Sequence, residues 1–140
     1  MRNLRYHLAV NIIKNMDERA FKTLVKYLEK IPAIQTPIGI GADENGFWWV
    51  KFQIDIDHEL AWNVVQELGC VLNYISINER LPTVFYPVSP APYLNGGAKD
   101  FLSWIIETKD KDFKPGTVKK WLEGRLPQPV DDLEQWNTDD

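Results

Sequence analysis

Residues 47–56 read Phe-Trp-Trp-Val-Lys-Phe-Gln-Ile-Asp-Ile, and Asp-His-Glu-Leu follows directly at 57–60. The odd positions of this stretch include Lys51, Gln53 and Asp55. The even positions are all apolar: Trp48, Val50, Phe52, Ile54 and Ile56. An apolar residue at every second position predicts a strand with one buried face, and Asp57 is a typical N-cap residue for a helix that follows it.

The segments before this strand predict a strand, a helix and a hairpin. Residues 5–14 alternate in a way that favours a strand, although Leu4, Leu8 and Ile12 also fit helical spacing. A helix is expected from an N-cap at Asp17 to the stop at Pro32, because the residue before a proline is disfavoured in helical conformation. Residues 36–41 and 47–56 predict a hairpin, since residues 42–46 end in Asn-Gly, which is typical of a tight turn.

After the central strand, the pattern predicts one more helix and two more strands. The helix is expected at 58–68 with Gly69 just past its end, and strands are expected at 70–77 and 83–88. The resulting order is that of a ferredoxin-like βαββαβ sandwich, an antiparallel sheet with two helices on one face, plus an extra strand. If residues 5–14 are helical instead, a cystatin-like α+β fold is the alternative.

The C-terminal part has a different character. Residues 87–97 contain Pro87, Pro90 and Pro92 and predict a stiff loop. Helices are expected at 99–107 and 117–123, followed by an extended tail. We therefore expect residues 1–98 to form the α+β core and residues 99–140 to form a helical extension packed on it, within one structural domain.

Composition narrows the class of protein. The chain has 140 residues, which is enough for one domain with its own core. The single cysteine, Cys70, excludes an intrachain disulfide and is expected to pack in the core. Neither a signal peptide nor an apolar run of membrane-spanning length is present, so a cytoplasmic location is expected.

The charge of the chain argues against a nucleic acid partner. The formal net charge is −4, and residues 57–140 carry eight Lys/Arg against fourteen Asp/Glu. An acidic balance opposes binding to a phosphate backbone. The acidic C-terminal end is expected to be a solvated tail.

Motifs that would indicate catalysis or a cofactor are weak. Asp55, Asp57, His58 and Glu59 form the densest polar cluster, which a small enzyme would use as acid and base or to bind a cation. Helix capping by Asp57 explains the same residues more simply. The glycines at 39 and 41 fit no phosphate-loop spacing, and no grouping of Cys and His has zinc spacing. We therefore assign no catalytic residue, no metal and no cofactor from the sequence.

The sequence offers an interaction surface instead. Aromatic side chains beside prolines provide rigid, amphipathic contact area, although the same side chains also suit internal packing. The expected surface residues are Trp49, Phe85, Tyr86, Pro90, Tyr93 and Asn95. The sequence thus favours a non-enzymatic protein-interaction or regulatory module whose partner is a protein, including a second copy. A small-metabolite sensor, by analogy of fold alone, and a small enzyme using the 55–59 cluster are the alternatives.

Overall fold

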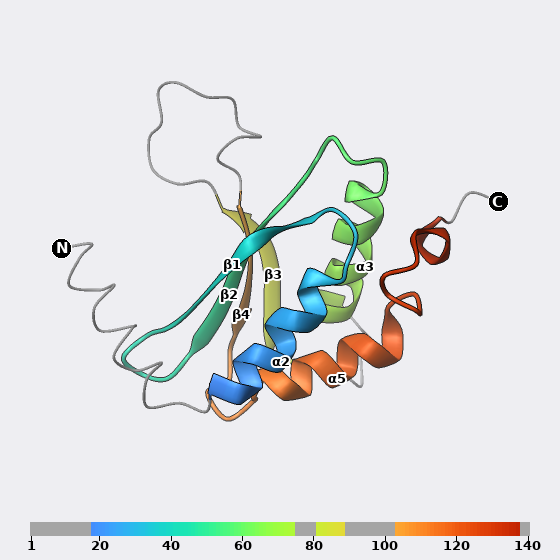
Figure 1. The fold of residues 1–140 in the computed structure, drawn as a ribbon. Helices are drawn as coiled ribbons and strands as arrows, with labels where there is room; N and C mark the ends of the chain where they lie inside the picture. Colours follow the sequence, from blue (N-terminus) through green and yellow to red (C-terminus); the bar gives the residue numbers. More distant parts are fainter. Residues whose placement is uncertain (1–17, 75–80, 89–102, 138–140) are drawn as a thin grey trace, which may run out of the picture.

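A computed structural model describes residues 18–74, 81–88 and 103–137 of the chain (Figure 1). In these residues the order of elements is helix, two strands, helix, two strands, helix and a short 3₁₀ helix. Their bounds are α2 Glu18–Glu29, β1 Ile34–Ala42, β2 Trp48–Ile54, α3 Ala61–Tyr74, β3 Thr83–Val88, β4 Ser103–Thr108, α5 Pro115–Arg125 and η1 Leu133–Trp136.

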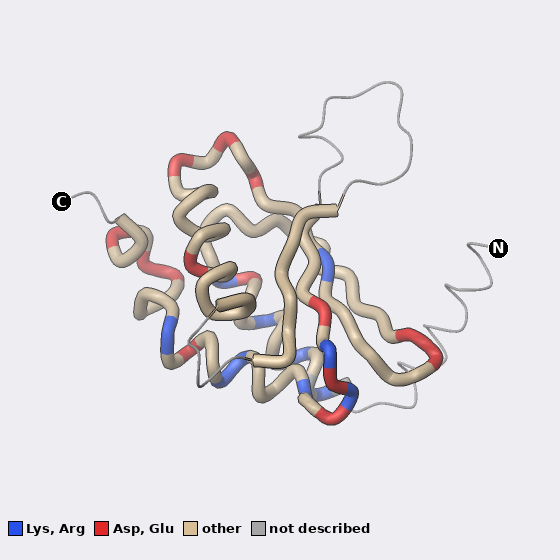
Figure 2. The backbone as a smooth tube through the Cα atoms, turned by 180° about the vertical axis from the view of Figure 1, so that it is seen from behind, with Lys and Arg blue, Asp and Glu red and all other residues tan. Residues whose placement is uncertain are grey.

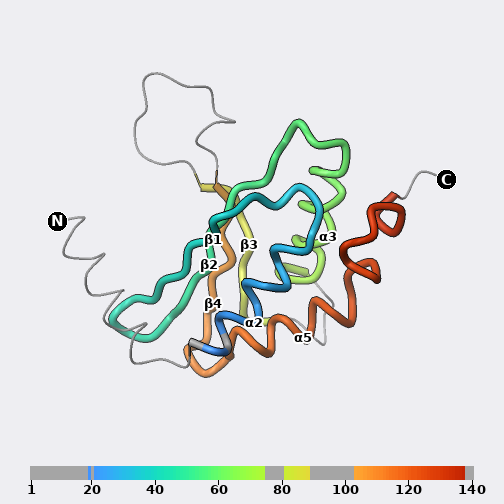
Figure 3. The backbone as a smooth tube through the Cα atoms, in the orientation of Figure 1, coloured from blue at the N-terminus to red at the C-terminus, as the bar shows by residue number. Residues whose placement is uncertain are grey.

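The described strands form one antiparallel sheet in the order β1-β2-β4-β3. Helices α2, α3 and α5 all lie on the same face of this sheet, as the tube in Figure 3 shows. The predicted α+β class with an antiparallel sheet is therefore confirmed. No helix within the described ranges combines the length and the apolar character that crossing a membrane requires.

The central strand is placed as its alternation predicts. Trp48, Val50, Phe52 and Ile54 are buried between the sheet and the helices, whereas Lys51 and Gln53 are exposed on the other face. Ile56 lies beyond the end of β2 and is only partly buried. The predicted hairpin is also confirmed, because β1 pairs with β2 through a turn in which the backbone N–H of Asp43 donates to the carbonyl of Phe47.

The predicted helix at 99–107 is wrong for its described part, because residues 103–108 form the strand β4. This strand lies between β2 and β3, in the interior of the sheet. Trp104 and Ile106 point into the core, whereas Ile105 and Glu107 are partly exposed on the other face. Residues 103–108 therefore belong to the sheet rather than to a helical extension. Residues 99–102 lie outside the described residues.

The second helix also differs from its prediction. It begins at Ala61 and runs to Tyr74, so it passes through Gly69, and the strand expected at 70–77 is wrong for residues 70–74. A glycine inside a helix costs roughly 0.5–1 kcal/mol. Burial of Val64, Leu68 and Leu72, spaced one turn apart, offsets this cost. Cys70 is exposed on the outer side of the helix, which corrects the expectation that it packs in the core.

The remaining helices complete the core. Helix α2 buries Phe21, Leu24 and Leu28 against the sheet, as its apolar stripe predicts, and α5 covers the expected helix at 117–123. The indole N–H of Trp48 donates to the carbonyl of Phe113, 2.7 Å away, which ties β2 to the segment before α5. The strand expected at 5–14 lies outside the described residues.

Candidate interaction surface

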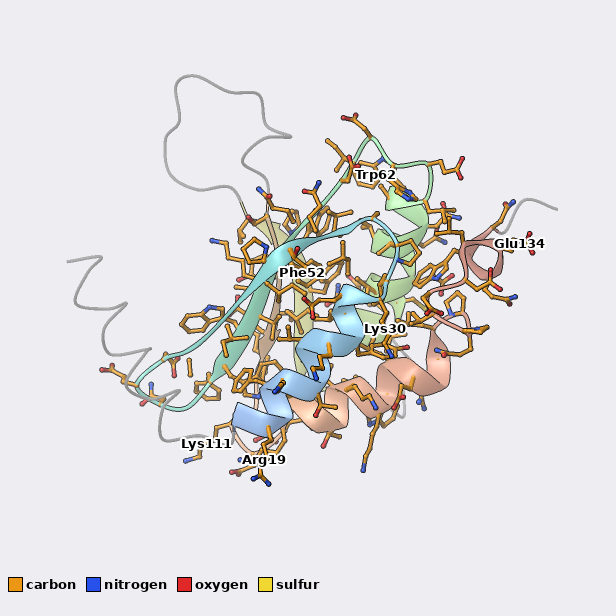
Figure 4. All side chains as sticks on the ribbon, in the orientation of Figure 1. Arg19, Lys30, Phe52, Trp62, Lys111 and Glu134 are labelled. Atoms are coloured by element: carbon orange, nitrogen blue, oxygen red, sulfur yellow. The ribbon has the colours of Figure 1, made fainter. Side chains whose placement is uncertain are left out.

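The face of the sheet opposite the helices carries the candidate surface. The register places Lys51 beside Ile105 and Ile105 beside Tyr86, and it places Trp49 and Val84 on either side of Glu107. Tyr86 keeps 38% of its surface exposed. In Figure 4 the helices, and Trp62 at the start of α3, lie on the other side of the strands. Apolar and charged side chains therefore alternate on this face, a mixture typical of recognition surfaces.

The indole of Trp49 occupies the space above Gly41, its partner residue on β1. A Cβ atom added to Gly41 would overlap the indole ring atoms, so only glycine leaves room for this packing. At Gly39, by contrast, an added Cβ would meet only the carbonyl oxygen of Lys51, at 3.8 Å. The glycine at 41 thus lets a large aromatic ring lie across the outermost strand.

The structure separates the residues predicted for the interaction surface. Trp49 and Tyr86 lie on the helix-free face. Phe85 does not belong to this surface, because it is 5% exposed and its ring stacks on Phe52 and Trp104 in the core. Pro90, Tyr93 and Asn95 lie outside the described residues.

The two outer strands of the sheet, β1 and β3, differ in whether described residues bond to the backbone groups on their outer edges. At β3, the side chain of Asn73 on α3 bonds twice to the backbone of Phe85. Its Nδ2 donates to the Phe85 carbonyl at 2.9 Å, and its Oδ1 accepts from the Phe85 N–H at 2.7 Å. One carboxamide therefore replaces the two backbone bonds that a neighbouring strand would make.

Two further features close this edge. Backbone groups alternate in direction along an antiparallel strand, so Pro87 faces outward like Phe85, and proline has no N–H to offer. The hydroxyl of Thr83 donates to the carbonyl of Leu72, 2.8 Å away, which holds the end of α3 against the strand. Sequence reasoning missed Asn73, since no local pattern shows that α3 ends beside β3.

The outer edge of β1 has no such cover among the described residues. Because Asp43 donates to Phe47, the alternation of the ladder directs Gly41 and Gly39 toward β2 and Ile40 and Ala42 away from it. No described strand pairs with these outward groups. None of the nine residues of β1 is charged. Pro37 and the register shift between Gln35 and Gly39 interrupt the first half only, so residues 39–42 pair regularly with β2. Along this part of the edge Gly39 is exposed and Ile40 is partly exposed, whereas Gly41 and Ala42 are buried.

The polar cluster at 55–59 is a turn. Asp57 does not cap the helix, because α3 begins only at Ala61. Instead Oδ1 of Asp55 accepts from the backbone N–H of Asp57 at 3.1 Å, and Nδ1 of His58 accepts from that of Leu60 at 3.0 Å. Within the described ranges no group of three or more His, Cys, Asp or Glu side chains is arranged to hold a metal ion. These bonds account for the cluster as local turn structure.

Comparisons of the chain with family models, with curated proteins and with solved structures found no match.

Proposed function

We propose that the protein is a non-enzymatic protein-interaction module, that its pairing surface is the outer edge of β1 at residues 39–42, and that the partner is a second copy of the chain. The observation that carries this proposal is the contrast between the edges. Asn73 and Pro87 close β3, whereas β1 directs the backbone groups of Ile40, which is partly exposed, away from β2. An uncharged edge that no described strand covers is a template for another strand.

A second copy fits this edge because the segment is complementary to itself. In an antiparallel pair centred on Gly41, Ile40 of each copy lies opposite Ala42 of the other and exchanges both backbone bonds with it. The two Gly41 residues then face each other as a non-hydrogen-bonded pair, whose Cα atoms are about 4.5 Å apart. Since the Trp49 indole lies over Gly41, the two indoles meet at the twofold axis.

Charges also match in this register. Gly39 lies opposite Asp43 of the second copy, and Lys51 lies beside Gly39 on the same face. Because Gly39 has no side chain, the Lys51 ammonium can cross the strand toward that carboxylate. The pairing surface is isologous, so each contact occurs twice and the assembly closes as a dimer.

Sedimentation velocity over micromolar to submillimolar concentrations tests the proposal on three proteins. The wild-type chain and the Ile40→Val control are expected to dimerise as concentration rises. Ile40→Pro is expected to stay monomeric, because the Ile40 N–H points away from β2 and its loss removes an outward donor while the bonds of the ladder to β2 remain. Circular dichroism and thermal melting confirm that the proline variant is folded. A wild-type chain that remains monomeric throughout, or a folded proline variant that dimerises equally well, contradicts the proposal.

We further propose that the fold is a cyclic reordering of the ferredoxin-like layout. In the described chain, α2, β1, β2, α3 and β3 are followed by β4. Moving β4 from the end of this order to its start gives βαββαβ, with the moved strand between β2 and β3. A circular permutant that begins at residue 103, with residues 140 and 1 joined by a flexible linker, should fold with an unchanged far-ultraviolet spectrum. Loss of its cooperative unfolding contradicts the reordering.

A further inference from the structure

Basic side chains are concentrated on two neighbouring helices. Residues 18–30 and 114–125 together carry eight Lys/Arg and three Asp/Glu, whereas the rest of the chain carries eight and seventeen. Helices α2 and α5 pack against each other, and Figure 2 shows the basic positions along both, with acidic positions in the loop before α3 and in the C-terminal segment. The surface formed by α2 and α5 therefore attracts anions although the whole chain is acidic.

An open pocket of about 390 Å³ lies on this basic surface, between α2, α5 and the segment that follows α5. Its volume falls within the range of small-molecule sites. Figure 4 labels Lys30 at the end of α2, beside this region. The lining residues are Thr23, Lys26, Tyr27, Lys30, Lys119, Glu123, Gln128, Pro129, Val130 and Asp131.

The lysine side chains that line the pocket differ in whether they form an ion pair with a described residue. Nζ of Lys119 pairs with Glu123 at 2.8 Å. Lys26 on α2 and Lys30, which directly follows α2, make no ion pair with another described residue. Two ammonium groups are thus available to an anion that enters the pocket, and lysine is a common phosphate ligand.

The hydroxyl of Tyr27, which is part-buried, adds a directed donor. Gln128 Nε2 donates to Tyr27 Oη at 3.1 Å and also to the carbonyl of Leu126 at 3.1 Å, and this second bond fixes which end of the amide carries the protons. Tyr27 therefore accepts from Gln128, and its own proton has no acceptor among the described residues. Burial raises the pKa of Tyr27 above its usual value, so the hydroxyl keeps this proton at neutral pH.

We propose that this pocket binds a small phosphorylated polyhydroxyl molecule, with its phosphate between Lys26, Lys30 and the Tyr27 hydroxyl. Asp131 and Gln128 also line the pocket, and their side chains carry acceptor oxygens, which suits the hydroxyl groups of such a ligand. The site is distinct from the β1 edge and does not depend on pairing between copies. It gives the protein a ligand-sensing surface in addition to its proposed interaction surface.

The test is a proton–nitrogen NMR titration with inorganic phosphate and, in parallel, with glucose 6-phosphate, while chloride keeps the ionic strength constant. Both ligands are expected to give saturable shifts at the amides of Tyr27, Lys119, Gln128 and Val130. Glucose 6-phosphate is expected to bind more tightly, because its hydroxyls reach Asp131 and Gln128. The double variant Lys26→Gln/Lys30→Gln should raise both dissociation constants by about tenfold or more.

The matched control is Lys22→Gln/Lys120→Gln, which removes the same amount of charge, from one position on α2 and one on α5, at exposed positions outside the pocket. Its dissociation constants should stay within about twofold of the wild-type values, because screening weakens distant charges. If phosphate binding weakens equally in both double variants, or if the chemical shifts do not saturate, the pocket is not a phosphate site. Equal affinity for the two ligands overturns the polyhydroxyl part and leaves the phosphate ion as the ligand.

Discussion

The two edges of the sheet show different solutions to the same physical problem. Each outer strand has backbone groups that point away from its only described neighbour, and such groups invite another strand. At β3 the carboxamide of Asn73 satisfies both groups of Phe85. At β1 the corresponding groups of Ile40 and Ala42 face outward without a described neighbour, and the indole of Trp49 lies beside them.

Closing an edge in this sheet thus depends on a few contacts and not on the overall composition of the strand. Neither β1 nor β3 contains a charged residue, so charge does not distinguish them. What distinguishes them is the side chain that the adjacent helix places against the strand. Asn73 therefore determines how the β3 edge behaves, and Gly41 with Trp49 determines how the β1 edge behaves.

The largest effect is expected from opening the closed edge with Asn73→Leu. The substitution leaves the N–H and the carbonyl of Phe85 without their side-chain partner, at a cost of about 2–4 kcal/mol for the two groups. Urea unfolding followed by fluorescence measures this loss. Light scattering should also show concentration-dependent aggregation, because β3 then exposes a pairing edge.

Asn63→Leu is the matched control for that variant. Asn63 lies on the same helix and donates from Nδ2 to the carbonyl of Trp136 at 2.8 Å, far from either edge. Its loss should lower the free energy of unfolding by about 1 kcal/mol without aggregation. If the two leucine variants aggregate equally, Asn73 does not protect the edge.

A smaller effect is expected from Gly41→Ala. The new methyl group displaces the Trp49 indole from the strand, which should reduce the free energy of unfolding by about 1–3 kcal/mol and weaken dimerisation. Chemical unfolding and sedimentation measure the two losses. Gly39→Ala introduces the same methyl group where space exists and should change stability by less than about 0.5 kcal/mol. Equal losses in the two alanine variants contradict the proposed role of the indole packing.

The smallest effect is expected from Lys51→Glu. Lys51 is exposed, so reversing its charge should leave the stability of the monomer nearly unchanged. In the dimer it replaces an attraction to Asp43 of the second copy with a repulsion, which should cost up to about 1 kcal/mol per contact at low salt. Sedimentation equilibrium with and without added salt measures this difference. An effect that persists at high salt does not come from this charge pair.

Part of the fold followed from the sequence because its causes are local. The period of two in residues 48–54 reports a half-buried strand, and the apolar stripe from Phe21 to Leu28 reports an amphipathic helix. The dipeptide Asn45-Gly46 predicts the turn between β1 and β2, because glycine readily adopts the positive φ of 88° that Gly46 has there. These signals depend only on neighbours along the chain.

Other parts depend on contacts that are distant in sequence. Residues 101–106 contain a nearly continuous apolar run, which periodicity cannot assign to a helix or a strand, and only its place between β2 and β3 makes it β4. Gly69 predicts a helix end, yet α3 continues beyond it because Leu68 and Leu72 are buried against the core. The bond from Asn73 to Phe85 depends on that extension, so the closed edge was not predictable from the sequence.

The most direct test of the central claim is amide hydrogen exchange, followed by NMR, at a low and a high protein concentration. The amides of Gly39 and Gly41 point toward β2 and should be protected at both concentrations. The amide of Ile40, which is partly exposed and points away from β2, should exchange rapidly in dilute solution and become protected as concentration rises, because a second copy then supplies its acceptor. Exchange at Ile40 that is the same at both concentrations contradicts pairing through β1.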